Sequence, residues 1–198
     1  MKSKDPLRLD AVVLAAGAGR RFGGRKLLAP WGEGDVLGAA IAIARQAPIR
    51  TLILVTGAEP GLGADRQGVS IAVQAESWDQ GMAHSLKAGL ESVPPDSQGV
   101  FIFLGDMPRI PPSVLHPMVD ALEAGAPAAA TSFEGRRGHP VLVSSHLFPA
   151  LLKLEGDQGA REVLDGLGHR LALVPAPDDG VLFDIDRPED LARDGGGA

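Results

Sequence analysis

The sequence alternates short apolar runs with amphipathic segments along most of its length. Seven runs have the composition of β-strands: residues 11–16, 51–57, 69–75, 100–106, 128–133, 139–145 and 170–176. Several are apolar at nearly every position, which is typical of strands buried on both faces of a sheet. Because helical patterns separate the runs, the alternation predicts an α/β fold with a mainly parallel sheet. In such folds ligands bind at the carboxyl ends of the strands.

The intervening segments have the periodicity of amphipathic helices. They cover residues 36–46, 81–90, 111–123, 146–154 and 158–167. In the first segment Leu37, Ile41 and Ala44 share one face. Residues 128–176 have a less regular pattern, and we expect them to form a small antiparallel extension over the sheet.

The length of 198 residues and the hydrophobic fraction of 44% are typical of one globular domain with a full core. We expect a single domain over residues 1–198, ordered from about residue 10 to 192, with a disordered tail at 194–198. No apolar run reaches the roughly 18 residues of a membrane span, and the first residues lack a signal-peptide pattern. We therefore expect a cytoplasmic protein that does not contact membranes.

Composition also excludes several kinds of chemistry. The chain has no cysteine, which excludes disulfides, thiolate catalysis and cysteine-based zinc sites and is compatible with a reducing cytoplasm. Its net charge of −6 argues against general nucleic-acid binding. Aromatic residues make up only 4%, and tyrosine is absent, so platforms that stack nucleic-acid bases are not expected.

A glycine-rich loop loaded with cations follows the first apolar run. Residues 12–26 read VVLAAGAGRRFGGRK. Gly17 and Gly19 allow close approach of the backbone to a ligand, and exposed amides in such a loop can bind phosphate. Four cations follow within seven positions: Arg20, Arg21, Arg25 and Lys26. A tight turn with solvated arginines is the alternative, but this concentration of positive charge in an acidic chain favours phosphate binding.

Two familiar phosphate loops do not match this stretch. The dinucleotide fingerprint requires glycine at the position of Phe22. The P-loop requires Gly-Lys-Ser/Thr, whereas Gly24 is followed here by Arg25, Lys26 and Leu27. Phosphate binding by this loop would therefore use a different arrangement of glycines and cations.

Carboxylates follow two later apolar runs. Asp106 comes directly after the run in FIFLGDMPRIPP, at the edge where ligands bind, although capping of the next turn explains it equally well. In LFDIDRPEDLA, Asp184 and Asp186 share a face if the chain is extended. Glu189 and Asp190 are best explained as acids that open a helix. Carboxylates together with substrate phosphates are the ligands that Mg²⁺ prefers.

The loop pattern L-A-A-G-x-G-x-R-x-G, with lysine shortly after, resembles nucleotidyltransferases of the glycosyltransferase-A-like fold. Within them it is most similar to the molybdenum cofactor cytidylyltransferases, a MobA-like NTP transferase family. The matching residues are Leu14, Ala15, Ala16, Gly17, Gly19, Arg21, Gly23 and Lys26. The resemblance implies a three-layer Rossmann-like fold in which these residues, apart from Gly23, bind a nucleotide. It also implies that Arg21 and Lys26 hold the triphosphate and the departing pyrophosphate.

The resemblance extends to the carboxylates and to the middle of the chain. It implies that Asp106, in a G-D-M-P motif, is catalytic and binds Mg²⁺ together with Asp186, with Asp184 as the reserve ligand. Arg187 stands where the family usually has threonine. The W-x-x-G-M-x-x-S-L segment implies nucleotide binding by Gly81 and Ser85, although Met82 there is better explained as a buried core residue.

Two further motifs match on the acceptor side. G-H-P-V contains His139, and G-D-x-G-A-R contains Asp157, Gly159 and Arg161. By resemblance these four residues bind the acceptor, with amides at the start of the helix holding a phosphate together with Arg161. The alternative for His139 is a structural role, in which the side chain hydrogen-bonds a turn.

The resemblance as a whole implies a magnesium-dependent nucleotidyltransferase. It would transfer CMP from CTP to molybdopterin or its molybdenum-loaded form, release pyrophosphate, and pass the product to a molybdoenzyme. CTP is expected over GTP because guanylyl-transferring relatives usually have glycine at the position of Ala16, whose methyl narrows the space for a purine.

Other functions stay open at this point. One is transfer to another phosphorylated acceptor, including guanylyl transfer and transfer to sugar or isoprenoid phosphates. A second is a non-catalytic chaperone that delivers the cofactor, which the presence of Asp106, Asp186, Arg21 and Lys26 disfavours. A third is a nicotinamide-binding oxidoreductase, which Phe22 disfavours.

Overall fold

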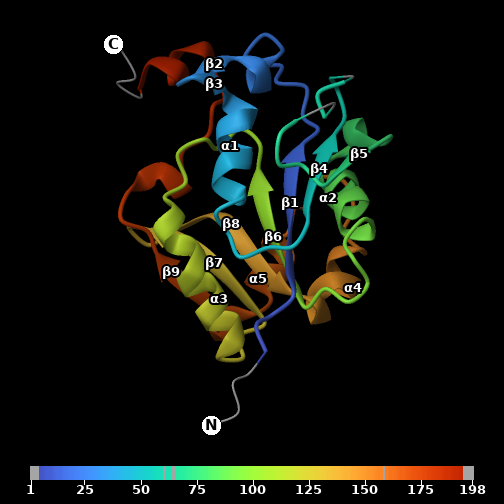
Figure 1. Ribbon diagram of the computed structural model, residues 1–198, viewed down its shortest axis with the longest axis vertical. Helices are drawn as coiled ribbons and strands as arrows, with labels where there is room; N and C mark the ends of the chain where they lie inside the picture. Colours follow the sequence, from blue (N-terminus) through green and yellow to red (C-terminus); the bar gives the residue numbers. More distant parts are fainter. Residues whose placement is uncertain (1–4, 60, 64–65, 158, 194–198) are drawn as a thin grey trace.

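A single sheet of seven strands organises the molecule, in the order β5-β4-β1-β6-β8-β7-β9 (Figure 1). The computed structural model describes residues 5–59, 61–63, 66–157 and 159–193, so the predicted disordered tail at 194–198 lies outside the described residues. The strands are β1 (Leu9–Ala15), β4 (Leu52–Thr56), β5 (Ile71–Gln74), β6 (Gly99–Leu104), β7 (Ala128–Phe133), β8 (Arg136–Ser144) and β9 (Leu171–Pro175). Each predicted apolar run thus contributes a strand, and the mainly parallel sheet is confirmed.

Strand β8 is antiparallel to both of its neighbours, β6 and β7, whereas the other paired strands of this sheet are parallel. We expected residues 128–176 to form an antiparallel extension over the sheet, but their strands β7, β8 and β9 belong to the sheet itself. Strand β8 lies inside the sheet because Val141, Leu142 and Val143 are buried and must be covered on both faces. Strand β9 then returns parallel to β7 and forms one edge.

Five α-helices flank the sheet in the described part of the chain. They are α1 (Val36–Ala44), α2 (Met82–Glu91), α3 (Leu115–Glu123), α4 (Phe148–Leu151) and α5 (Arg161–Asp165). The last two are much shorter than the predicted helices at 146–154 and 158–167. A two-stranded hairpin, β2 (Pro30–Trp31) with β3 (Gly34–Asp35), precedes α1, and Asp35 caps that helix by accepting from the Gly38 amide. None of the described helices is long and apolar enough to cross a membrane.

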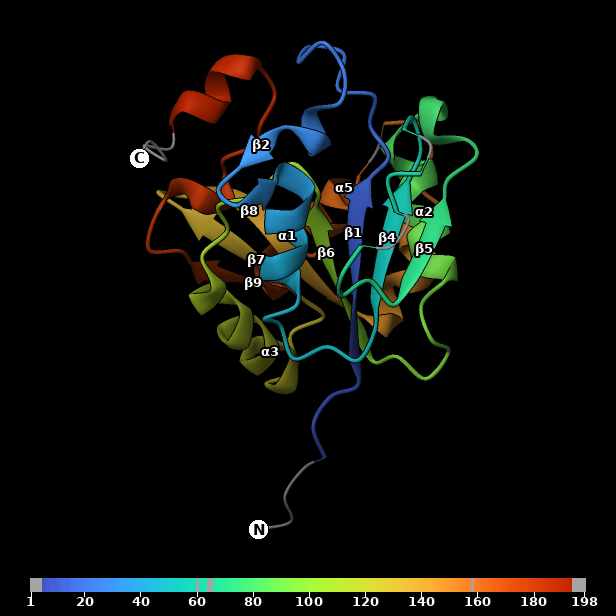
Figure 2. The same cartoon turned by 45° about the horizontal axis from the view of Figure 1, so that its top comes forward.

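The helices form two outer layers around the sheet, as Figures 1 and 2 show. Helices α1 and α3 pack on the face of β1 that carries Ala11 and Val13. Helices α2, α4 and α5 pack on the opposite face, which carries Val12. Because successive side chains of a strand point to opposite faces, one strand supplies both cores. The predicted three-layer α/β fold is confirmed.

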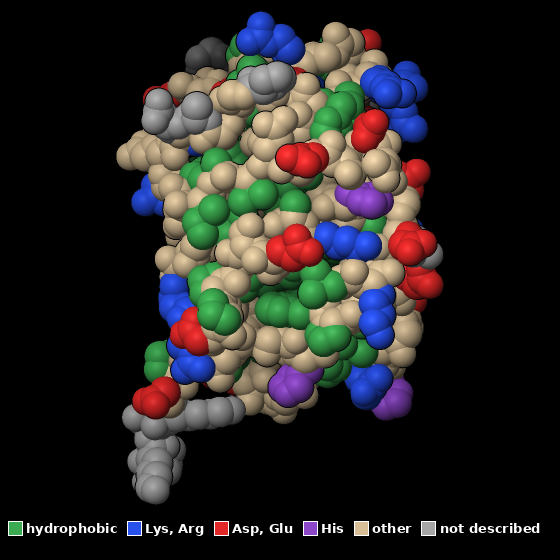
Figure 3. Space-filling view, turned by 90° about the vertical axis from the view of Figure 1, so that its right-hand side faces the viewer, with side chains coloured by type: hydrophobic (Ala, Val, Ile, Leu, Met, Phe, Trp, Pro, Cys, Tyr) green, Lys and Arg blue, Asp and Glu red, His purple; other side chains and the backbone are tan. Residues whose placement is uncertain are grey.

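The carboxyl ends of β1, β4 and β6 lie at one end of the molecule, turned toward the viewer in Figure 2. The loop after β1 and the C-terminal segment around residues 182–193 gather at this end (Figure 2). The side of the molecule seen in Figure 3, over β5 and α2, has acidic, basic and hydrophobic side chains interspersed. Predicted ligand-binding residues such as Gly17, Arg21, Asp106 and Asp186 therefore come from loops that share one end of the sheet, whereas Ser85 lies in α2 and His139 in β8.

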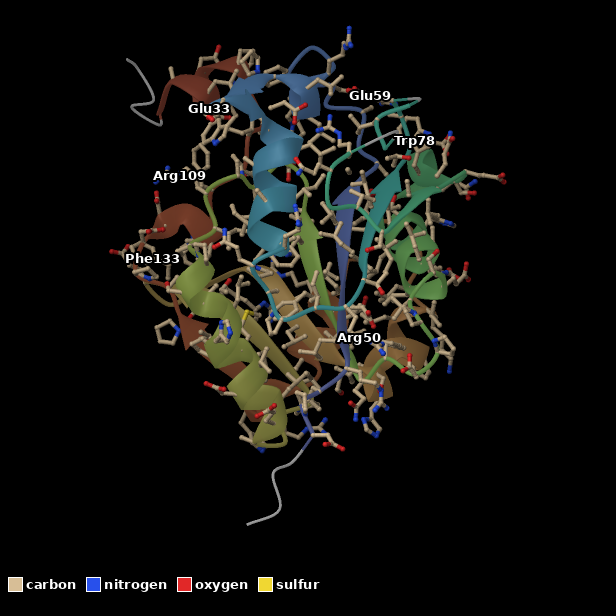
Figure 4. All side chains as sticks on the ribbon, viewed as in Figure 1. Glu33, Arg50, Glu59, Trp78, Arg109 and Phe133 are labelled. Carbon is tan, nitrogen blue, oxygen red and sulfur yellow. The ribbon has the colours of Figure 1, made fainter. Side chains whose placement is uncertain are left out.

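A buried ion pair closes the opposite end. Asp10 in β1 is 0% exposed, and its Oδ2 accepts from Arg50 Nη2 at 2.9 Å. Arg50 Nη1 also donates to Asp96 Oδ2 at 2.8 Å, near the surface. Figure 4 shows Arg50 at the end of the molecule away from Trp78. A fully buried carboxylate depends on its cation because its charge has lost hydration.

We expect Arg50→Met to lower the melting temperature by about 5 to 10 °C, because it leaves the Asp10 charge buried and unpaired. Asp96→Asn is the matched control. It removes an exposed charge that pairs with Arg50 and Arg8, and it should lower the melting temperature by less than about 3 °C. Thermal unfolding of both variants at neutral pH provides the comparison. Equal losses would mean that Asp10 does not depend on Arg50.

Candidate active site

The loop after β1 folds back on itself and brings Lys26 beneath it. Amides of Phe22 and Gly24 both donate to the Gly19 carbonyl, at 3.0 and 3.1 Å. Gly19 has φ +57°, and a Cβ there would lie 3.2 Å from Cγ of Lys26. A Cβ on Gly17, in contrast, would meet nothing within 4 Å. Gly19 therefore serves the fold of the loop, whereas Gly17 keeps the backbone accessible from the cavity.

Lys26 is the electrostatic centre of the site. It is only 9% exposed, and its Nζ lies 2.6 Å from Oδ2 of Asp106 and 3.7 Å from Oδ1 of Asp186. Arg21 Nη1 donates to Oδ2 of Asp186 at 2.7 Å. The Ile185 amide donates to the Asp106 carbonyl at 2.9 Å, which ties the two carboxylate segments together. Two predicted cations and two predicted metal ligands thus meet at one place.

The charges distinguish the two candidate ligands of the C-terminal segment. The hydrogen bond from Arg21, helped by the charge of Lys26, holds the pKa of Asp186 below its ordinary value. Partial burial, followed by repulsion from Asp106 and Asp186, raises the pKa of Asp184, although part of its surface stays exposed. These opposite directions favour Asp186 as the ionised partner of Asp106.

A cavity of about 500 Å³ opens over these groups. Its lining includes all the residues predicted to bind nucleotide or metal, apart from the reserve Asp184: Leu14, Ala15, Ala16, Gly17, Gly19, Arg21, Lys26, Gly81, Ser85, Asp106 and Asp186. Trp78 and Asp79 also line it and were not among the predicted residues, although Trp78 opens the W-x-x-G-M motif. A Cβ on Gly57 would lie 2.6 Å from Cβ of Trp78 and 2.8 Å from that of Ala16, so the Ala16 methyl packs beside Trp78.

A second cavity, of about 770 Å³, adjoins the first. The four residues predicted to bind the acceptor all line it: His139, Asp157, Gly159 and Arg161. Leu14, Met82, Leu104 and Asp157 line both cavities, so they form a common wall. Two ligands bound side by side would therefore meet at the carboxyl ends of β1 and β6.

The side chain of Met82 is not in the core, where the sequence pattern predicted it. We expected this side chain in the core, but it is 46% exposed and faces both cavities. The reason is the turn at Gly81, whose φ of +117° starts α2 so that Ala83 and Leu86 take the core positions. Ser85, one turn into the helix, is buried against the first cavity.

The start of α2 packs against the loop that carries the acceptor residues. The Ala83 amide donates to the Gly156 carbonyl at 3.0 Å, and a Cβ on Gly81 would collide with the backbone of Gly156. A Cβ on Gly159 would lie 3.1 Å from the Met82 sulfur. Glycine at these positions therefore allows the two cavities to adjoin.

His139 and Arg161 differ in character. Nδ1 of His139 is buried and has no hydrogen-bond partner among the described residues, and burial lowers the pKa of the ring, which is neutral near pH 7. Arg161 is 86% exposed and lies 3.9 Å from Asp165. Because α5 has only five residues, its dipole contributes little to the predicted phosphate site at its start.

Comparison with known proteins identifies the family. The MobA-like NTP transferase domain matches residues 11–172. The chain belongs to this family. It is 34% identical over 200 residues to the purine catabolism protein PucB of Bacillus subtilis (strain 168), covering 92% of this chain and 93% of PucB. It is 27% identical over 187 residues to the molybdenum cofactor cytidylyltransferase of Escherichia coli (strain K12), and the match covers 92% of this chain and 93% of that protein.

A solved structure agrees with this assignment. The crystal structure of Rv0371C in complex with manganese, from Mycobacterium tuberculosis H37Rv, superposes with a TM-score of 0.75. It is 28% identical in sequence, and the match covers 95% of this chain and 97% of that one. The resemblance expected from the motifs is confirmed, and this MobA-like chain is a nucleotidyltransferase.

For this MobA-like protein we expect Arg21→Ala to weaken nucleoside triphosphate binding about tenfold, as loss of a charge-assisted hydrogen bond does. Arg20→Ala is the matched control, because Arg20 is exposed at the rim of the same cavity and occupies a variable position of the motif. It should change the affinity by less than about threefold. Calorimetric titration with triphosphate and with nucleoside measures both effects. Equal losses would indicate a diffuse charge patch instead of a specific contact.

Proposed function

We propose that this nucleotidyltransferase transfers CMP from CTP to a molybdopterin-type acceptor and releases pyrophosphate. The observation that carries the proposal is the meeting of Lys26, Arg21, Asp106 and Asp186 in the first of two cavities that share a wall. The similarity to the Escherichia coli cytidylyltransferase supports this acceptor. A molybdoenzyme that receives the product is the corresponding partner.

The carboxylates fit a divalent cation such as Mg²⁺. Asp106 and Asp186 both approach one buried ammonium group, so their oxygens already stabilise positive charge at a common point. In the part of the chain that the structure describes, no group of three or more acidic or histidine side chains is arranged to hold a metal. Substrate phosphates would therefore complete the ligand shell, as they commonly do for Mg²⁺. Bound there, the ion would supply charge neutralisation and orientation of the phosphates.

The chain's own residues account for the rest of the chemistry. Arg21 and Lys26 would hold the triphosphate and neutralise the charge that develops on the leaving pyrophosphate. Gly17 would let the backbone approach the phosphates. An acceptor phosphate in the second cavity would attack the α-phosphorus in line, so catalysis comes mainly from positioning and electrostatics.

A second candidate function rests on the likeness to PucB. That relative is named a purine catabolism protein and is more similar in sequence than the cytidylyltransferase. The same nucleotidyl transfer would then serve purine breakdown, through a phosphorylated acceptor other than molybdopterin. Assays that pair each of the four triphosphates with molybdopterin, or leave the acceptor out, distinguish the two candidates.

We expect Asp106→Asn to lower turnover about a hundredfold or more, because it removes a charge that the reaction requires while keeping the shape of the side chain. The measurement is pyrophosphate release with CTP, molybdopterin and Mg²⁺. Asp120→Asn, at an exposed position of α3, is the control and should leave the rate unchanged. Near-normal turnover of Asp106→Asn would contradict the assignment of Asp106.

We also expect the wild type to prefer CTP and Ala16→Gly to admit GTP. The Ala16 methyl lines the nucleotide cavity beside Trp78, and a purine pressed against it would cost about 1–3 kcal/mol, which corresponds to a preference of about 5- to 150-fold. The test is the ratio of kcat/KM for CTP and GTP on both proteins with one acceptor. A wild type that prefers GTP would refute the cytidylyl assignment. An unchanged ratio in the variant would refute only the steric mechanism.

A further inference from the structure

The two carboxylate-bearing segments meet through Arg109, a residue outside the two ligand cavities. Arg109 lies three positions after Asp106 in the loop that follows β6. Its Nη2 lies 3.1 Å from Oδ1 of Asp179, and its guanidinium carbon lies 4.6 Å from the centre of the Phe183 ring. Figure 4 shows Arg109 on the side of the molecule where the C-terminal segment runs. One side chain thus holds two points of the segment that leads to Asp186.

Phe183 also contacts a second aromatic side chain. Its ring centre lies 6.2 Å from that of Trp31 in β2, with a tilted orientation. The ring therefore packs against both an aromatic side chain and a guanidinium group, which together restrict its movement. Phe183 immediately precedes Asp184 and lies three residues before Asp186, so it anchors the chain close to both carboxylates.

The backbones of the two segments are in close contact as well. A Cβ on Gly180 would collide with the Arg109 carbonyl, and the Ile185 amide donates to the Asp106 carbonyl at 2.9 Å. Ile185 is fully buried. In the sequence, the residues that contact Arg109 therefore precede Asp184, and the Ile185 hydrogen bond follows it.

We propose that Arg109 is a positioning residue for the metal-binding carboxylates, and this inference rests on the proposed function. By holding Asp179 and Phe183, Arg109 sets the distance of Asp186 from Asp106. Mg²⁺ tolerates little variation in the geometry of its ligands, and Mn²⁺ prefers the same octahedral oxygen ligands, so a loosened segment lowers metal affinity. Lysine cannot replace arginine fully, because a planar guanidinium both pairs with a carboxylate and stacks on a ring.

The test measures Mn²⁺ binding to the full chain by the electron paramagnetic resonance signal of the free ion, with CTP equimolar to the protein and the Mn²⁺ bound by CTP alone subtracted from a protein-free titration. We expect Arg109→Met to weaken Mn²⁺ binding about tenfold and Phe183→Leu to weaken it similarly. Arg109→Lys, which keeps the pair with Asp179, should have an intermediate effect. CTP binding without metal should not change, because Arg21 and Lys26 are intact. Arg170→Met, at an exposed position, is the control.

The outcomes separate the two hypotheses. Wild-type Mn²⁺ affinity in Arg109→Met or Phe183→Leu would overturn the positioning role and leave the proposed function standing. A wild-type protein that binds no Mn²⁺ with CTP would overturn both. If Arg109→Met does not fold, Arg109→Lys decides the question, since it must weaken Mn²⁺ binding while its melting temperature stays equal to that of the control.

Discussion

The buried ammonium of Lys26 is the constraint on which the candidate site depends. An unpaired cation in this position would cost several kcal/mol, so Lys26 requires Asp106, and it draws Asp186 toward the same point. These three residues come from the loop after β1, the loop after β6 and the C-terminal segment. The site therefore cannot form until distant parts of the chain have folded together.

The positive charges of the first loop stand out against the acidity of the chain as a whole. The chain as a whole is acidic, with a net charge of −6, and would repel a triphosphate. Three cations of the first loop, Arg20, Arg21 and Lys26, line the first cavity, where Gly17 leaves the backbone accessible. The Lys26 side chain is 11% exposed, so water and salt screen its charge only weakly, whereas the Arg21 side chain is 77% exposed and is screened more strongly.

Sequence patterns predicted the strands well because buried parallel strands are apolar at almost every position. They missed the β2–β3 hairpin, since strands of two residues have no periodicity to detect. They could not decide whether Asp106 caps a turn or faces a ligand, because the answer depends on Lys26, which is far away in the chain. Met82 was misplaced since helical periodicity does not show which side of the first turn faces a cavity. The contact of Arg109 with Phe183 leaves no local pattern at all.

The arrangement of the two cavities follows from a small number of glycines. Gly81 and Gly159 let the start of α2 and the loop before α5 approach each other more closely than other residues would allow. As a result the wall between the cavities is thin, formed by side chains such as Leu14 and Met82. In a transfer between two bound substrates, the rate depends on how closely and how rigidly the reacting atoms are held. Backbone packing outside the chemistry therefore controls that distance, and the charged residues act within the geometry that it sets.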